Sequence, residues 1–382
     1  MRIAKRVQDL AQSDIRRMTR ECERLNGINL GQGICDLPTP GPVRDGAIAA
    51  IRENRSTYSF AEGARELRDA IARKLLDDNG LRADPVSEIC VTVGASGAYT
   101  AAIHALLDPG DGILLFEPYY GYHLNAALVA GLVPGFATLA PPDFALREEA
   151  LEAAITPRTR AVVVCTPSNP SGKMFTREEL SIVSRVARRH DLLVITDEIY
   201  EYIRYDGRPH VPPASVEGLR ERTVTIMGLS KTFSITGWRL GYTFAPAEMT
   251  RAITLVNDLY YVCAPTPLQL GAARGFAAPR SYFDELQSGY QRKRDRICAA
   301  LREARLLPIV PQGAYYVLAD CSRLGFATAR EAAMHVLTAS GVASVPGSAF
   351  YRGAEGEKLL RFCFAKDDAV LDEACGRLAA LR

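Results

Sequence analysis

Short apolar segments alternate with helical segments through the middle of this chain. The strand-like runs are 89–93, 113–116, 161–165, 192–196, 224–227 and 240–244. A strand that is apolar along its whole length is buried on both faces, and alternation with helices builds βαβ units with parallel strands. The pattern predicts an α/β protein with a mostly parallel sheet, of the seven-stranded type, sandwiched between helices.

The last hundred residues have a different pattern. A long charged helix is predicted at 282–305, followed by short strands near 315–318 and 360–364. Because 382 residues are many for a single core, a second and smaller α+β domain is expected here. The segment before Pro42 is too short to fold alone and should pack on that domain. We therefore expect a large domain at 43–280 and a small domain formed by both termini, 1–42 and 281–382.

Composition and charge exclude several classes of function. The formal net charge is +2 with no basic block, which argues against nucleic acid or an anionic membrane as a partner. No apolar run approaches the roughly 18–20 residues that span a bilayer, and the first 24 residues show no signal peptide. The nine cysteines include no CxxC pair, and the five histidines form no metal-binding pattern. We expect buried, reduced thiols, a cytoplasmic location and no metal.

The stretch GLSKTFSITGWRLGYT at 228–243 is the most informative for chemistry. Lys231 follows a strand-like run at 223–227, and Arg239 comes eight positions later. A lysine amine can capture a carbonyl covalently while a nearby arginine holds an anionic tail, as in enzymes that bind an aldehyde cofactor bearing a phosphate. Taken alone, these residues also fit a basic surface loop.

Two further turns follow predicted strands, where ligands bind in an open α/β sheet. Gly94, Ala95, Ser96 and Gly97 open a helix, so that small residues and free N–H groups favour an anion. Tyr120 ends the sequence Glu-Pro-Tyr-Tyr and is placed to stack on a planar heterocycle. Each feature also has an ordinary interpretation. Residues 94–97 fit a plain strand-to-helix turn, and Tyr120 fits an aromatic residue of the core.

Polar residues follow or interrupt three other strands. Asn169 lies between two prolines in the turn at 166–172. These prolines restrict the loop and so fix the direction of the Asn169 amide. Asp197 ends a buried strand, where a carboxylate needs a partner such as a protonated ring nitrogen. Arg361 lies within an apolar strand, where a guanidinium favours a planar carboxylate. For both charged residues, an ion pair within the protein is the alternative.

Together these residues describe one site for pyridoxal 5′-phosphate. Lys231 would hold the aldehyde, Asp197 the ring nitrogen and Arg361 a substrate carboxylate. Tyr120 would stack on the ring. Hydrogen bonds to the phenolic oxygen are expected from Asn169 and Tyr200, and phosphate contacts from Ala95, Ser96, Gly97, Ser230 and Arg239.

The motifs PSNPSG at 167–172, DEIY at 197–200 and Ser230-Lys231, in the stretch 230–239, follow one another in that order along the chain. In these motifs the chain resembles the class I/II aminotransferases, which belong to the fold-type I pyridoxal-phosphate enzymes. The resemblance implies that Lys231 forms the Schiff base and that Gly33 lies near the substrate carboxylate. It also implies a homodimer with shared active sites, in which Tyr58 reaches the cofactor phosphate of the partner.

The expected activity is transfer of the amino group of an L-amino acid to a 2-oxo acid such as 2-oxoglutarate or pyruvate, with Lys231, Asp197 and Tyr200 as catalytic residues. Residues 31–33 (Gly-Gln-Gly) resemble members that use neutral, aromatic or sulfur-containing donors. A dicarboxylic donor is less favoured, since no second arginine can be assigned to a distal carboxylate. A lyase or synthase, catalysing C–S β-elimination or a cyclisation, is the alternative.

Two positions depart from the family pattern. Gly228 stands where a serine is frequent, three residues before Lys231, so one hydroxyl contact with the phosphate is expected to be missing. Ile34-Cys35-Asp36 stands where many members have a proline before the aspartate. That loop is expected to border the substrate pocket, so it bears on which substrate is used.

Overall fold

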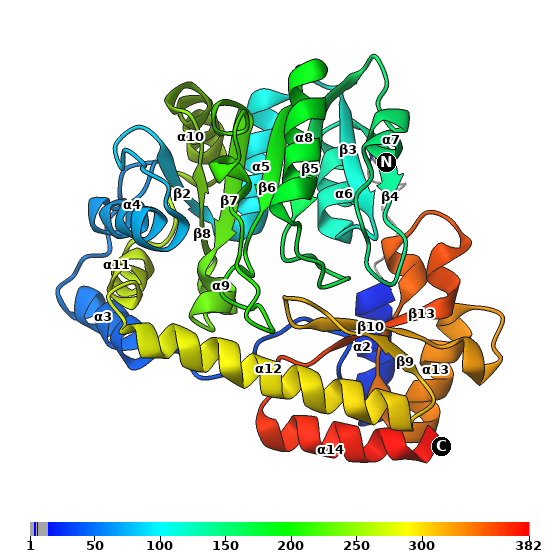
Figure 1. Ribbon diagram of the computed structural model, residues 1–382. Coiled ribbons are helices and arrows are strands. Elements are labelled where there is room, and N and C mark those ends of the chain that lie inside the picture. The colour runs from blue at the N-terminus through cyan, green and yellow to red at the C-terminus, as the bar shows by residue number, and fades with distance from the viewer. Residues whose placement is uncertain (1–3, 5, 7–13, 382) are drawn as a thin grey trace.

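The computed structural model describes residues 4, 6 and 14–381, and its largest feature is a seven-stranded sheet (Figure 1). Its strands are β2 (Ile89–Val93), β3 (Gly112–Glu117), β4 (Val133–Thr138), β5 (Thr159–Cys165), β6 (Leu193–Asp197), β7 (Thr223–Gly228) and β8 (Leu240–Phe244). Their order is β2-β8-β7-β6-β5-β3-β4. Strand β8 is antiparallel to both of its neighbours, and the other pairs are parallel. The predicted, mostly parallel sheet is confirmed.

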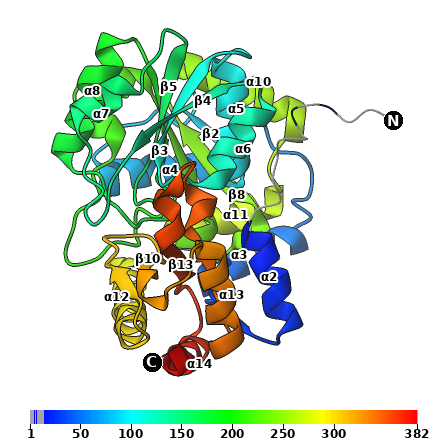
Figure 2. The ribbon, with the colours of Figure 1, turned by 90° about the vertical axis from the view of Figure 1, so that its right-hand side faces the viewer.

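Helices cover both faces of this sheet (Figure 2). One layer contains α5 (Gly94–Leu106), α6 (Gly121–Val129) and α10 (Ala247–Tyr261), and the other α7 (Glu148–Ala153) and α8 (Arg177–Arg189). Successive side chains of a strand point to opposite faces. Ile113 and Leu115 of β3 accordingly pack with α5, whereas Leu114 and Phe116 pack with α8. This two-sided burial explains why the strands are apolar throughout.

A third group of helices packs at the edge formed by β2 and β8. It contains α3 (Gly41–Arg52), α4 (Arg65–Asn79) and α11 (Thr266–Gly275). Helix α4 is followed by Gly80, which adopts the left-handed conformation (φ 65°) that is common for a glycine at the end of a helix. The single turn α9 (Leu229–Thr232) follows β7 and carries Lys231.

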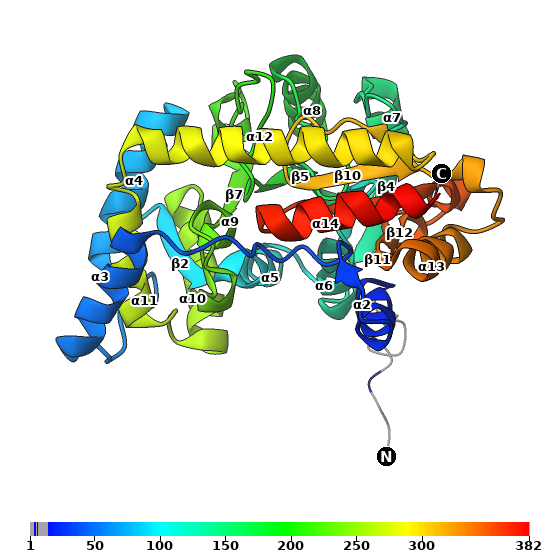
Figure 3. The same cartoon turned by 90° about the horizontal axis from the view of Figure 1, so that it is seen from below.

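The C-terminal part forms a second, antiparallel sheet. Its order is β12-β13-β10-β9, from β12 (Val345–Pro346), β13 (Leu359–Cys363), β10 (Tyr316–Asp320) and β9 (Leu307–Ile309). Helices α12 (Arg280–Glu303) and α14 (Asp368–Leu378) run side by side below it (Figure 3), and α13 (Ala329–Ser340) also packs here. Short 3-10 turns occur at Pro213–Ser215, Arg220–Arg222, Thr236–Trp238, Ser322–Leu324, Gly347–Phe350, Ala354–Lys358 and Ala379–Leu381.

The N-terminal segment lies against this C-terminal part. Helix α2 (Asp14–Arg24) buries Met18 and Cys22, one turn apart, in the same core as α13 and α14. Strand β1 (Ile28–Asn29) pairs in parallel with β11 (Val342–Ala343). Residues 1–3, 5 and 7–13 of the predicted small domain lie outside the described part of the chain. The domain boundaries at 42/43 and 280/281 remain a prediction.

The sequence analysis missed strand β4, and it placed the ends of some helices and strands inaccurately. The sequence of β4, VPGFAT, contains a proline and a glycine, which weaken a strand signal. An edge position tolerates them because only one side of the strand pairs. Helix α12 begins at Arg280, two residues before the predicted start at 282. Among the described helices, none is both long and apolar enough to cross a membrane.

Leu30 anchors the N-terminal segment, because it is fully buried and its backbone bonds to both Ala343 and Cys363. We expect Leu30→Ala to lower the free energy of unfolding by about 2–5 kcal/mol, through lost burial and the cavity left behind. Urea unfolding followed by circular dichroism measures this. Leu76→Ala, at an exposed leucine of α4, is the control and should change stability little. Equal effects of the two substitutions would contradict this docking.

Candidate functional site

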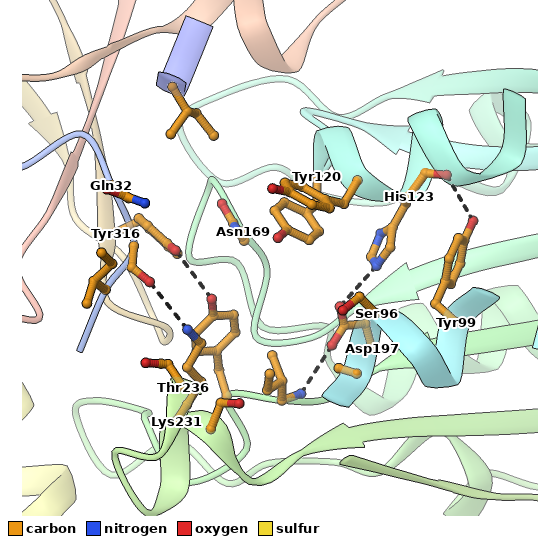
Figure 4. Close-up of a pocket in the computed structure, with 18 of the residues that line it drawn as sticks. Gln32, Ser96, Tyr99, Tyr120, His123, Asn169, Asp197, Lys231, Thr236 and Tyr316 are labelled. Carbon is orange, nitrogen blue, oxygen red and sulfur yellow. Dashed lines mark hydrogen bonds and ion pairs between the residues drawn. The ribbon is translucent and has the colours of Figure 1, made fainter. Parts of the chain in front are cut away.

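A cavity of about 410 Å³ lies at the carboxyl ends of the strands of the large sheet (Figure 4). Its volume is typical of small-molecule sites, and its position is where ligands bind in such sheets. Most of the predicted site residues line it: Gly33, Ala95, Ser96, Tyr120, Asn169, Asp197, Tyr200, Ser230, Lys231, Arg239 and Arg361. Residues spread over more than 300 positions of sequence are thus brought into one site.

Two predicted residues do not line this cavity. Gly97 is buried in the first turns of α5, one residue beyond Ser96. Tyr58 lies outside the cavity and is 80% exposed. The phosphate contacts expected of both residues therefore remain predictions.

Lys231 lies in the interior of the site. Its Nζ donates a hydrogen bond to the Gly33 carbonyl at 3.3 Å and lies 5.3 Å from the centre of the Tyr315 ring. Burial lowers the pKa of this amine below its usual value, and the positive charge of Arg239 adds to the lowering. A lower pKa increases the neutral fraction of the amine, which is the form that attacks a carbonyl or accepts a proton.

Gly33 connects the lysine to two tyrosines of the C-terminal sheet. Its carbonyl also accepts a hydrogen bond from the Tyr315 hydroxyl at 3.1 Å. A side chain at position 33 would overlap the Tyr316 hydroxyl, so this close approach requires a glycine. Tyr200 in turn donates to Tyr316 at 3.5 Å. Sequence reasoning missed both tyrosines, although they lie at the start of a strand that it predicted.

Asp197 is the last residue of β6, and its buried carboxylate faces the cavity. His123 Nε2 lies 3.0 Å from its Oδ2, and the Tyr99 hydroxyl donates to the His123 carbonyl at 3.2 Å (Figure 4). The histidine thus fixes the orientation of the carboxylate. Sequence reasoning missed His123. The signal was available, because a histidine three residues after Tyr120 lies on the same side of a helix.

Three elements converge at the other end of the cavity. Arg239 donates from Nη2 to Ser96 Oγ at 3.1 Å and from Nη1 to the Thr236 carbonyl at 2.8 Å. A Cβ built on Gly94 would lie 2.6 Å from Arg239 Nη2, so the helix N-terminus and the guanidinium are in close contact. Ser230 adds a hydroxyl. A helix N-terminus, hydroxyls and a guanidinium together fit a phosphate.

The unusual glycine at position 228 has a structural explanation. A side chain added there would overlap Ile199 Cδ1 and lie 3.3 Å from Ala95 Cβ. The space that a serine would need is therefore filled by Ile199, which itself lines the cavity. In this chain a serine at position 228 would require Ile199 to move.

Arg361 is 1% exposed and has no acidic partner among the described residues. Its Nη1 donates to Asn169 Oδ1 at 2.9 Å, and its Nη2 donates to the Gly31 carbonyl at 2.7 Å. The guanidinium lies between the rings of Tyr316 and Phe350, at 4.3 and 4.7 Å. Neutral oxygens and ring faces hold the cation without cancelling its charge. It therefore suits an incoming carboxylate.

The donor set fits pyridoxal 5′-phosphate. The cavity offers a buried amine of lowered pKa for the aldehyde and a buried carboxylate for the ring nitrogen. A phosphate cradle lies on one side, and Tyr120 provides a ring on the cavity wall. The guanidinium of Arg361, which has no acidic partner among the described residues, remains for a substrate.

Other lining residues were not predicted. Gln32, Thr100, Ala126 and Thr236 lie around the cavity, and helix α2 contributes Ile15 and Arg16. Tyr122 also lines the cavity, whereas Tyr58, Tyr119 and Tyr260 do not. Ile34, from the loop that departs from the family pattern, also lines it.

Comparison with known proteins gives consistent results. The family model for aminotransferase class I and II matches residues 26–378. The structure of N-succinyldiaminopimelate aminotransferase from Mycobacterium tuberculosis superposes with a TM-score of 0.96 at 34% identity, over all of both chains. The structure of YbdL from Escherichia coli, described with a methionine aminotransferase function, gives 0.95 at 31% identity over 99% of both chains.

A mammalian protein is similar over nearly the same length. Kynurenine–oxoglutarate transaminase 3 of Rattus norvegicus is 34% identical over 97% of this chain and 88% of its own length. The family match, the fold and the arrangement of the cavity agree. This chain therefore belongs to the class I and II aminotransferases, which use pyridoxal 5′-phosphate as their cofactor.

Proposed function

We propose that the enzyme transfers the amino group of a neutral, aromatic or sulfur-containing L-amino acid to a 2-oxo acid such as 2-oxoglutarate or pyruvate. The observation that supports this proposal is the buried guanidinium of Arg361, which has no acidic partner among the described residues. It lies in a cavity that Ile34, Tyr122 and Ile15 also line. Such a site would hold a carboxylate at one point and accept an uncharged side chain beside it. The names of kynurenine and methionine aminotransferases among the similar proteins support this choice.

Five residues that line the cavity have roles in this proposal. Arg361 binds the substrate carboxylate, and Asn169 orients it. Bound pyridoxal phosphate supplies the carbonyl that captures the amino group and a ring that accepts electrons from the substrate Cα. The Nζ of Lys231, with its lowered pKa, removes the Cα proton as a general base. Asp197, oriented by His123, holds the positive charge of the ring nitrogen.

An exposed apolar surface beside the phosphate end supports a homodimer. It contains Tyr58, Phe60, Leu255, Leu259, Tyr260, Tyr261 and Val262. Hydrogen bonds from Thr266 to Thr57 and from Gln269 to Ser59 hold the segment with Tyr58 against α11. Tyr261 lies against Gly97, one residue from Ser96. A second copy covering this surface would bring the partner's Tyr58 to the phosphate end of the cavity, where Arg239 is exposed.

The cysteines support a reducing compartment. All nine are unpaired, and most of them are buried. We therefore place the enzyme in the cytoplasm, where such thiols remain reduced.

The direct test is a half-reaction with single amino acids and no oxo acid. We expect the visible band of the bound cofactor to be replaced by a near-ultraviolet band, with one equivalent of 2-oxo acid formed per site. Methionine, phenylalanine and kynurenine should react faster than aspartate. A visible band that persists while ammonia and pyruvate accumulate would instead establish a lyase, and a cyclised product would establish a synthase.

Lys231→Ala should reduce kcat by on the order of 10⁴-fold, because the general base is lost. The phosphate end is unchanged, so some affinity for the cofactor should remain. Steady-state assays and cofactor titration measure the two effects. Lys358→Ala, at an exposed lysine in a short turn, is the control and should be fully active. Turnover of Lys231→Ala within a few-fold of the unmodified enzyme would refute the assignment.

Hybrid dimers test the shared site. Lys231→Ala and Tyr58→Ala each impair their own homodimer, but in a mixed dimer one site would combine an intact Lys231 with an intact Tyr58. We expect mixing after reversible dissociation to raise activity well above the mean of the two variants. Activity equal to that mean would show that Tyr58 does not serve the partner's site. Sedimentation velocity confirms that mixed dimers form.

A further inference from the structure

A short segment of the chain connects Arg361 with the large sheet. Arg361, to which the proposed function assigns the substrate carboxylate, lies on β13, and its β-sheet partner is Val345 of β12. Farther along the chain, the ring of Phe350 returns to the guanidinium of Arg361, at 4.7 Å from its centre. The next residues, 351–352, reach the end of β3, just before Tyr120 on the cavity wall. The segment thus runs from the arginine of the second sheet to the cofactor side of the site.

Two hydrogen bonds attach this segment to the end of β3. The amide of Tyr119 donates to the Phe350 carbonyl at 3.0 Å, and the amide of Arg352 donates to Glu117 Oε1 at 2.7 Å. Between these two points, Tyr351 is buried in the same apolar cluster as Phe350. The backbone on both sides of Tyr351 is therefore held, and the direction of the Phe350 ring is restricted with it.

Glu117 is a costly choice for one of these two bonds. Its carboxylate is buried and has no basic partner among the described residues. Its Oε2 accepts from the Thr138 hydroxyl at 2.8 Å, and its Oε1 accepts from the Arg352 amide. Burying a carboxylate without a counter-charge is destabilising. A hydrogen bond to an ionised acceptor is, however, shorter and stronger than one to a neutral oxygen. The carboxylate therefore holds the segment more tightly than a neutral side chain would.

We propose that Glu117 is a positioning residue for the substrate carboxylate. By holding the Arg352 amide, it fixes the Phe350 ring against one face of the Arg361 guanidinium. The other face lies on the ring of Tyr316, at 4.3 Å. A guanidinium held between two rings keeps one orientation, and a bidentate pair with a carboxylate requires such an orientation. This inference rests on the proposed function and adds the residue that aligns its arginine.

Glu117→Ala should weaken ligands that carry a carboxylate. We expect calorimetry with the cofactor-loaded protein to show about tenfold weaker binding of 3-phenylpropionate, which is phenylalanine without its amino group. The KM for phenylalanine should rise similarly, with a smaller change in kcat. The Kd of the cofactor should stay within about twofold, because the phosphate contacts come from other elements. Glu117→Gln keeps an acceptor for the Arg352 amide and should recover most of the lost affinity.

Glu179→Ala is the matched control for a general loss of stability. Glu179 is also a buried glutamate beside the large sheet, and it accepts hydrogen bonds from the amides of Leu146 and Thr176. This variant should lower the melting temperature and leave the affinity for 3-phenylpropionate unchanged. If Glu179→Ala and Glu117→Ala weaken this ligand equally, or if neither weakens it, the proposal is overturned.

A double-mutant cycle tests whether Glu117 acts through Phe350. Phe350→Leu removes the ring from the Arg361 guanidinium and should by itself weaken 3-phenylpropionate about as much as Glu117→Ala does. Combining the two substitutions should add little, because both act on the same contact. Additive losses would show that Glu117 acts by another route and would overturn the proposal.

These binding measurements are independent of turnover. If no amino acid reacts in the half-reaction, the proposed function fails, but the affinities for 3-phenylpropionate still decide the role of Glu117. If the unmodified protein does not bind 3-phenylpropionate, there is no carboxylate site for Glu117 to align, and the inference is overturned.

Discussion

The site depends on burying the guanidinium of Arg361 without an acidic partner. A buried charge is costly, and proteins usually cancel it with an opposite one. Here the cation is instead held by two neutral oxygens, from Asn169 and Gly31, and by the faces of Tyr316 and Phe350. Because these partners do not neutralise it, the charge remains available to a carboxylate. The partners come from both sheets and the N-terminal segment, so all three must pack correctly.

The close approach at Gly33 connects the same three parts. Its carbonyl accepts from Lys231, which follows the large sheet, and from Tyr315, which lies just before a strand of the second sheet. Tyr316 occupies the space that any side chain at position 33 would need. The burial that lowers the pKa of Lys231 is thus a consequence of how the N-terminal segment closes over the lysine. Packing and reactivity are linked at this point.

Some features were predictable because they are local. Apolar strands followed by small, polar or charged residues predicted the parallel sheet and placed Ser96, Asn169 and Asp197 at one edge. Strand β4 was missed because an edge strand tolerates a proline and a glycine that obscure its pattern. His123 was missed because its spacing from Tyr120 places it on one side of a helix but does not identify the group that its ring contacts. Only its contact with Asp197 reveals its role.

The sequence alone determined the fold class and the family and predicted a role for Lys231, since these depend on residue type, order and spacing along neighbouring strands. Tertiary structure alone decided which residues from distant segments share the cavity. Tyr315 and Tyr316 reach Gly33 across more than 280 positions of sequence, and Arg16 joins the wall because α2 docks beside β12. No local pattern encodes such contacts. They arise from the way the N-terminal helix and the second sheet bury their apolar faces together.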